Sequence, residues 1–169
     1  QQRAARRLTI VVPLSLASIF VLLFWAFKSV SKAGLILAMV PFTLIGGFGA
    51  LALAGMHLSI SAAVGFIAVA GICVQNGVIL VEEVQTGLNN GLGKAAAIVQ
   101  GAVTRMRPIL MTALMAGIGL LPAALSHGIG SETQRPFALV IVGGIVSATV
   151  FTLLLLPTLL FMAEREDNA

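Results

Sequence analysis

Long apolar runs separated by short polar segments dominate the chain. Five runs with few or no charged residues lie at about 8–27, 34–56, 58–83, 108–126 and 136–163. Each is close to the roughly 20 residues that an α-helix needs to cross the hydrocarbon core of a bilayer. They lack the alternating polarity of barrel strands, and in lipid the backbone must satisfy its own hydrogen bonds. The pattern predicts an all-α fold, a polytopic membrane helix bundle with five transmembrane helices.

The segments between these runs differ in length. The connections near residues 28–32 and 55–57 are so short that they predict antiparallel neighbouring helices. In the longer segment before residue 108, glycine and asparagine interrupt the chain at 87–93, and residues 94–105 contain alanine and valine among polar residues. This predicts a short interfacial helix at about 94–105. Pro136 is expected in the first turn of the fifth helix. Residues 1–7 are interpreted as the end of a missing periplasmic segment and 164–169 as a cytoplasmic tail.

Composition supports a membrane protein. Hydrophobic residues make up 59% of the chain and charged residues 9%, too few polar groups to cover a water-soluble globule. Membrane lipid is therefore an expected partner. The net charge of +4 is small, and no basic patch contains interleaved aromatic residues, which argues against nucleic-acid binding. The single cysteine, Cys73, lies in the third run and is expected to pack as a small apolar residue.

The basic residues of the short loops indicate an orientation. Six of them, Lys28, Lys32, Lys94, Arg105, Arg107 and Arg165, fall on the side of the carboxyl terminus, and Arg135 falls on the other. By the positive-inside rule the carboxyl terminus is cytoplasmic and the amino terminus periplasmic. Arg3, Arg6 and Arg7 oppose this assignment, and the conflict disappears if a translocated domain precedes them.

Small residues recur where helices could touch. Gly46, Ala50 and Ala54 follow small-xxx-small spacing, and Gly143, Gly144 and Ala148 approximate it. Such spacing predicts close backbone approach between transmembrane helices. Packing alone is the favoured interpretation of both sets.

The amides Gln75 and Asn76 stand out because they lie inside an apolar run. Gln75 comes four residues after Gly71 and so shares a helix face with a position that another helix could approach. Polar residues at membrane depth are often functional. Neither amide titrates, so neither can carry a proton. Hydrogen bonding to a partner helix, worth about 1 kcal/mol or less, is favoured over a direct part in ion transfer.

Other polar residues have simple structural interpretations. Thr112 can bond to its own backbone, Arg105 and Arg107 can anchor at the membrane interface, and Glu82 and Glu83 can be a solvated helix end. His127, Ser131 and Glu132 share one loop but do not make a catalytic triad by proximity in sequence. No histidine or carboxylate pair has metal-ligand spacing within a run. We therefore predict no enzyme activity, no cofactor and no resident metal.

Two stretches of the chain carry a family resemblance. Residues 65–84 read GFIAVAGICVQNGVILVEEV, and residues 104–160 include RMRPILMT and GSETQRPFALVIVGG. The chain resembles the resistance-nodulation-division (RND) efflux transporters over essentially its whole length. Within them it is most similar to the heavy-metal efflux branch, of the cobalt-zinc-cadmium type.

The resemblance implies that the five helices are similar to the last five of twelve in a proton-driven pump of the bacterial inner membrane. Such a pump is a homotrimer that works with a periplasmic adaptor and an outer-membrane channel, and its amino-terminal part is a further partner of this segment. Gln75 matches a position where the family carries an ionisable residue, while Arg105 and Thr112 match polar residues of the next helix and retain their types. A proton-relay support role for Gln75, Asn76, Arg105 and Thr112 follows by resemblance. The alternative is a truncated, non-transporting remnant that only associates with other helices.

Overall fold

The computed structural model describes the backbone of residues 2–166 and the side chains of residues 3 and 6–163. Five α-helices account for nearly all of it: α1 (Gln2–Phe27), α2 (Val30–Leu53), α3 (Ile60–Asn89), α4 (Lys94–Leu125) and α5 (Ser131–Glu166). All five are long and apolar enough to cross a membrane. The predicted all-α bundle of five transmembrane helices is confirmed.

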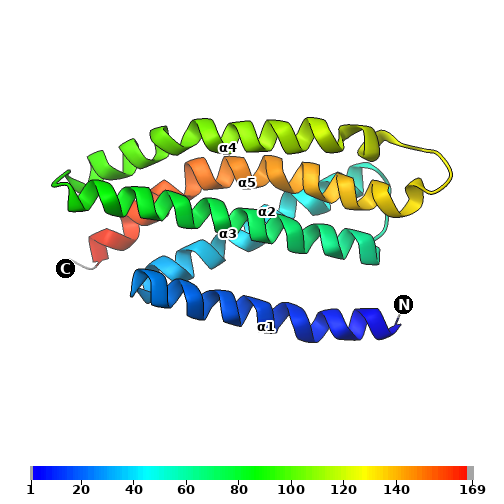
Figure 1. The fold of residues 1–169 in the computed structure, drawn as a ribbon, viewed down its shortest axis with the longest axis horizontal. Helices are drawn as coiled ribbons and strands as arrows, with labels where there is room; N and C mark the ends of the chain where they lie inside the picture. Colours follow the sequence, from blue (N-terminus) through cyan, green and yellow to red (C-terminus); the bar gives the residue numbers. More distant parts are fainter. Residues whose placement is uncertain (1, 167–169) are drawn as a thin grey trace.

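The helices run antiparallel to their neighbours in sequence, and α5 lies at the centre (Figure 1). It packs against α2, α3 and α4, whereas α1 lies at one edge and contacts α2 and α3. The two termini lie at opposite ends of the bundle (Figure 1). We call the end that carries the α1–α2 turn, the α3–α4 turn and the carboxyl terminus the Lys28 end.

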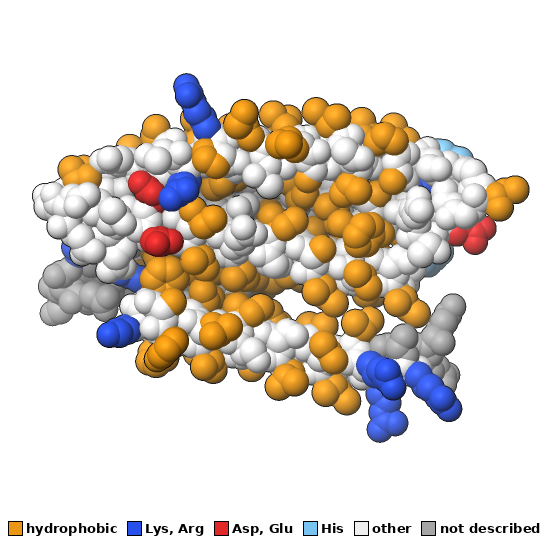
Figure 2. Space-filling view, viewed as in Figure 1, with side chains coloured by type: hydrophobic (Ala, Val, Ile, Leu, Met, Phe, Trp, Pro, Cys, Tyr) orange, Lys and Arg blue, Asp and Glu red, His pale blue; other side chains and the backbone are white. Residues whose placement is uncertain are grey.

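Apolar side chains cover the sides of the bundle, and charged side chains gather toward its two ends (Figure 2). This surface suits a bilayer, in which apolar side chains face lipid and charges remain near water. Helix α1 is the most exposed helix, since Leu23 is its one buried hydrophobic residue among those described. Its packing leaves open space between α1 and the other helices (Figure 2).

Helices α2 and α5 approach most closely where glycine faces glycine. A methyl group added at Gly46 would lie 2.3 Å from the Gly143 carbonyl oxygen, and one added at Gly143 would lie 2.5 Å from the Gly46 carbonyl oxygen. Gly144 meets α3 in the same way, with 2.6 Å to a Val69 methyl. The predicted close backbone approach at these small residues is therefore observed.

A chain of polar contacts crosses the same interface. Ser147 Oγ donates to the Thr43 carbonyl oxygen at 2.7 Å, which links α5 to α2. Thr43 Oγ1 lies 3.0 Å from Cys73 Sγ, which links α2 to α3. Cys73 is buried, as expected for a small apolar residue. These hydroxyls are satisfied inside the bundle, where an unpaired polar group would be costly.

Several predicted helix boundaries are wrong. The interfacial helix expected at about 94–105 is not a separate element, because α4 continues through Pro108 to Leu125. Likewise α5 begins at Ser131, five residues before Pro136. Each proline removes one intrahelical hydrogen bond without ending its helix. Of the tail expected at 164–169, residues 164–166 continue α5 and residues 167–169 lie outside the described part, as does Gln1.

Candidate functional site

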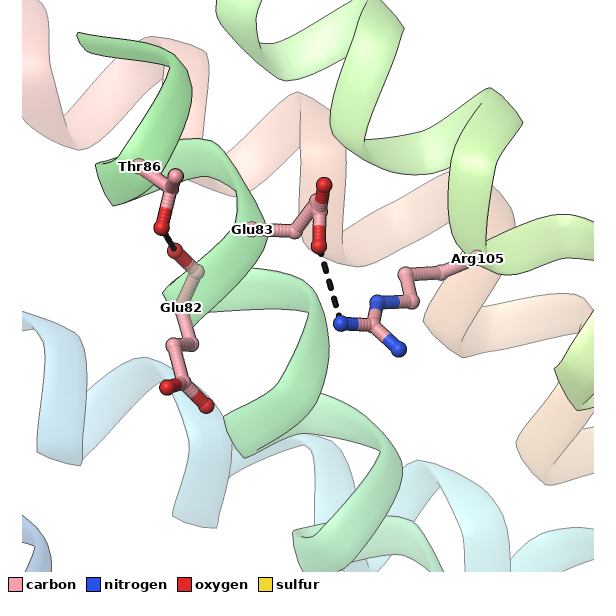
Figure 3. Close-up of polar contacts among 4 residues, drawn as sticks. All are labelled: Glu82, Glu83, Thr86 and Arg105. Carbon is pink, nitrogen blue, oxygen red and sulfur yellow. Dashed lines mark hydrogen bonds and ion pairs between the residues drawn. The ribbon is translucent and has the colours of Figure 1, made fainter. Parts of the chain in front are cut away.

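An ion pair between α3 and α4 is the strongest candidate site near the Lys28 end. Arg105 Nη2 lies 2.8 Å from Glu83 Oε2, and the two side chains point toward each other across the helix interface (Figure 3). Both are about a third exposed, at 33% for Arg105 and 28% for Glu83. Such a pair contributes modestly to stability, about 1 kcal/mol or less. Its larger effect is to fix where the guanidinium lies.

Arg105 keeps hydrogen-bonding capacity after this pair has formed. Its Nε atom is buried and has no hydrogen-bond partner in the described part of the chain. A buried donor without a partner is uncommon and needs an explanation, such as an ordered water or a missing group. Two residues further on, Arg107 is exposed, which fits the expected anchoring at the membrane interface.

The loop between α3 and α4 sets the register of this pair. Gly101 lies against Val84, with 2.8 Å from an added methyl at Gly101 to a Val84 methyl, and Gly87 lies against Ala97 at 3.2 Å. Gly91 has a positive φ of 84° and makes the tight turn between the helices. This antiparallel register brings residue 105 of α4 beside residue 83 of α3.

Thr112 has a local partner. Its Oγ1 donates to the carbonyl oxygen of Pro108 at 2.9 Å, within the same helix, and the residue is exposed. The prediction that it bonds to its own backbone is confirmed. The hydroxyl oxygen keeps lone pairs that can accept a hydrogen bond from outside the described helices.

Gln75 and Asn76 lie near the middle of α3. Gln75 is exposed and Asn76 is partly buried, and neither amide side chain forms a hydrogen bond with any described residue. A methyl group added at Gly71, one turn earlier, would meet nothing within 4 Å. The face of α3 that carries Gly71 and Gln75 is thus uncovered in this chain. The expectation that Gln75 bonds a partner helix remains a prediction.

The structure joins only some of the residues predicted from sequence. It brings Arg105 to Glu83, but no hydrogen bond within the described residues connects Gln75, Asn76, Arg105 and Thr112 to one another. The partnership of Glu83 was missed, because Glu82 and Glu83 were interpreted as a solvated helix end. That interpretation agrees with the exposure of Glu82, which points away from Arg105 (Figure 3). No group of three or more histidine, cysteine, aspartate or glutamate side chains that could hold a metal occurs in the described part.

Comparison with known proteins identifies the family. Residues 1–164 match the model of the AcrB/AcrD/AcrF family. The chain belongs to this family. The matched residues contain all five helices up to the last turn of α5.

Relatives of known name place the chain in one branch of the AcrB/AcrD/AcrF family. It is 45% identical to the cobalt-zinc-cadmium resistance protein CzcA of Cupriavidus metallidurans over 167 residues, 99% of this chain and 16% of that protein. It is 47% identical over 168 residues to the nickel and cobalt resistance protein CnrA of the same organism, with the same coverage of 99% and 16%. It is 38% identical to the cation efflux system protein CusA of Escherichia coli K12, over 92% of this chain and 16% of that protein.

A solved structure agrees with these matches. The crystal structure of a heavy metal efflux pump, crystal form II, superposes with a TM-score of 0.87 at 48% identity, over 98% of this chain and 17% of that one. The resemblance to RND efflux transporters of the heavy-metal branch is therefore confirmed. The relatives are transporters rather than enzymes, and this chain spans about 16% of their length.

Proposed function

We propose that this chain is the carboxyl-terminal membrane portion of a proton-driven RND pump that exports heavy-metal cations. The relatives named for cobalt, zinc, cadmium and nickel resistance support the class of substrate. The single observation that carries a coupling role is the Arg105–Glu83 pair, because it holds a guanidinium with a free donor beside the helix that carries Gln75.

The site supports a division of roles within that function. Arg105 supplies a permanent positive charge that can stabilise a carboxylate on a helix outside these residues. Thr112 supplies a hydroxyl oxygen, and Gln75 and Asn76 supply amides, which can orient such a carboxylate or a water but cannot carry a proton. Glu83 holds Arg105 in place. The titrating groups of the coupling site then belong to the remaining, amino-terminal part of the pump.

The proposed membrane arrangement follows the charges of the short loops. The Lys28 end faces the cytoplasm, and the opposite end, with the amino terminus, faces the periplasm of a bacterial inner membrane. The 1–7 segment then joins a periplasmic domain. A homotrimer with a periplasmic adaptor and an outer-membrane channel is the proposed assembly of the complete pump. Exposed α1 and the uncovered face of α3 leave room for contacts with its other helices.

Metal transport by the complete pump tests this function. Cells that lack their own metal efflux and express the complete pump should retain less cobalt, zinc, cadmium or nickel than cells without it. A protonophore should abolish the difference, because export is driven by proton entry. Equal retention with and without well-expressed pump, or export that persists with the protonophore, contradicts the proposal. Equal retention would also favour the alternative, a remnant that only associates with other helices.

Gln75→Leu tests whether its amide bonds a partner helix or acts in coupling. In the complete pump we expect a lower thermal midpoint, by an amount corresponding to about 0.6 kcal/mol, with the pH dependence of metal efflux unchanged. Val64→Leu is the matched control, because Val64 is an exposed apolar residue of the same helix. An unchanged midpoint together with a shifted pH profile would overturn the packing role.

A further inference from the structure

A pocket outside the Arg105–Glu83 site opens between the end of α1 and the last turns of α3. Its volume is about 460 Å³. Three lining residues are apolar (Ala26, Phe27 and Val78) and five are polar (Lys28, Glu82, Gln85, Thr86 and Asn89). The pocket thus combines an apolar wall with a dense group of hydrogen-bonding side chains, and nothing in the proposed transport role uses it.

The pocket lies near the Lys28 end of the bundle, close to an exposed tryptophan. Trp25, one turn before Lys28, is 80% exposed. Tryptophan is enriched at the membrane–water interface, where its ring lies at headgroup level. Leu22 on the same helix is 64% exposed, so lipid tails can reach along α1.

The polar lining residues of α3 lie on one helix face, because they are spaced three and four residues apart. They are Glu82, Gln85, Thr86 and Asn89. Two of them already have one partner. Lys32 Nζ donates to Gln85 Oε1, which leaves the NH₂ group of Gln85 as a donor. Thr86 Oγ1 donates to the Glu82 carbonyl oxygen at 3.0 Å, which leaves its own oxygen as an acceptor (Figure 3). The Glu82 carboxylate points away from Arg105 (Figure 3) and is free to accept.

Lys28, which lines the pocket, has a strained backbone conformation. Its φ is +50°, and it is the one described residue other than glycine with a positive φ. Its N–H donates to the Phe24 carbonyl oxygen at 2.7 Å and closes α1. Glycine is the residue that adopts this conformation without steric cost, so the turn itself does not require lysine. Strain of this kind concentrates at binding sites, and Lys28 is one of the residues that line this pocket.

We propose that this pocket binds the headgroup of a zwitterionic aminophospholipid of the phosphoethanolamine class. Lys28 and Glu82 in the lining match a ligand with one charge of each sign, and the Lys32 ammonium bonded to Gln85 adds to the positive charge on the side that meets the phosphate. The lipid phosphate accepts from Lys28 and the Gln85 amide, while the primary ammonium donates to the Glu82 carboxylate and Thr86. The acyl chains lie along Ala26, Phe27 and Val78. A bare metal cation fits less well, because the Lys28 ammonium would repel it within the same pocket.

The ammonium group makes the proposal selective. A primary ammonium donates up to three hydrogen bonds, whereas the quaternary ammonium of a phosphocholine lipid donates none. Loss of one hydrogen bond to a charged group lowers affinity by about tenfold or more. We therefore expect phosphoethanolamine lipid to bind about tenfold more tightly than phosphocholine lipid with the same acyl chains.

Native mass spectrometry of the complete pump, titrated with phosphoethanolamine, phosphocholine and phosphoglycerol lipids of identical chains, measures this preference. Glu82→Gln should reduce the tenfold preference over phosphocholine to about twofold or less, because the carboxylate is lost. Lys28→Gly should weaken both zwitterionic lipids while leaving thermal stability equal or higher, since glycine relieves the positive φ. Glu132→Gln, which removes an exposed carboxylate at the opposite end of the bundle, should change neither affinity.

Four results would overturn the proposal. In the unaltered pump, these are equal affinity for the two zwitterionic lipids and tighter binding of the anionic phosphoglycerol lipid. The third is a preference for phosphoethanolamine over phosphocholine lipid that is unchanged in Glu82→Gln. The fourth is binding of water-soluble glycerophosphoethanolamine as tight as that of the intact lipid. The last result would assign the pocket to a soluble phosphoethanolamine ligand instead of a membrane lipid. A pocket filled by other helices of the pump would give the first result.

Discussion

Gly46→Ala is expected to destabilise the bundle by about 3 kcal/mol, the largest stability effect that the structure indicates for a single added methyl group. The new methyl would lie 2.3 Å from the Gly143 carbonyl oxygen and 2.5 Å from Ser147 Oγ. Both distances are far inside van der Waals contact. The nearer atom belongs to the backbone of α5, so the two helices must separate rather than let one side chain rotate.

The separation would also break a hydrogen bond. Ser147 Oγ donates to the Thr43 carbonyl oxygen at 2.7 Å, one turn from Gly46. Moving α5 away from α2 lengthens this bond and leaves the Ser147 hydroxyl with only its longer contact, at 3.4 Å, to the Gly144 carbonyl oxygen of its own helix. The loss of packing and the loss of the hydrogen bond therefore act in the same direction.

Thermal unfolding of the complete pump in detergent, together with the yield of folded particles in gel filtration, checks the prediction. Gly49→Ala is the matched control, because Gly49 lies three residues further along α2 and an added methyl there meets nothing within 4 Å. We expect this control to melt at the same temperature as the unaltered pump or higher, since alanine favours helix more than glycine does. Equal midpoints for Gly46→Ala and Gly49→Ala would show that α2 and α5 can part without loss.

The close approach of α2 and α5 could be predicted only in part. The small residues Gly46 and Gly143 predict that α2 and α5 each have a face that allows close backbone contact. The sequence did not indicate that these two faces meet each other, because other glycines, such as Gly71 and Gly117, have nothing within 4 Å of an added methyl. Pairing depends on which faces meet in three dimensions, and the spacing within one helix does not contain that information.

The wrong helix boundaries have a common physical cause. Pro108 and Pro136 were interpreted as helix starts, an inference that holds where water can satisfy the exposed backbone groups. Within and next to an apolar bundle, ending the helix would expose several backbone groups, whereas continuing it past proline loses one hydrogen bond. All six prolines of the chain lie inside helices, which indicates that the same balance applies along its length.

The partnership of Glu83 with Arg105 was missed for a related reason. If residues 94–105 form a separate interfacial helix, Arg105 lies in the membrane plane and away from α3. Once α4 is continuous through Pro108, the short turn at 90–93 makes α3 and α4 antiparallel neighbours, and positions 83 and 105 come side by side. The turn residues were recognised in the sequence, so the missing step was the continuity of α4.

Arg105→Ala in the complete pump is expected to lower metal efflux about tenfold, equivalent to about 1.4 kcal/mol in the rate-limiting barrier. The reason is the loss of a positioned positive charge with a free Nε donor. Protein should still reach the membrane, because a pair that is about a third exposed contributes little to folding. Thr112→Ala should also lower efflux, but less, since its hydroxyl proton is committed to the Pro108 carbonyl oxygen.

Efflux of cobalt or zinc from loaded cells, normalised to the amount of pump in the membrane, measures these effects. Arg107→Ala is the matched control, because it removes an exposed arginine two residues away that has no described partner. Normal efflux in both Arg105→Ala and Thr112→Ala would refute the relay-support role, and an equal loss in Arg107→Ala would assign the effect to interfacial charge.

Glu83→Gln distinguishes two effects of Glu83, namely holding the Arg105 guanidinium in place and supplying a negative charge. Glutamine keeps an oxygen that can accept from Arg105 Nη2, so the guanidinium stays beside α3 while the negative charge is lost. If Glu83 acts only by holding Arg105, the efflux rate should fall by less than about threefold, which corresponds to roughly half of the Arg105→Ala loss in free energy. In Arg105→Ala, adding Glu83→Gln should then cause no further loss, because a residue that acts through another has no effect once that residue is gone. A further decrease in the double variant would mean that the Glu83 carboxylate itself takes part in coupling.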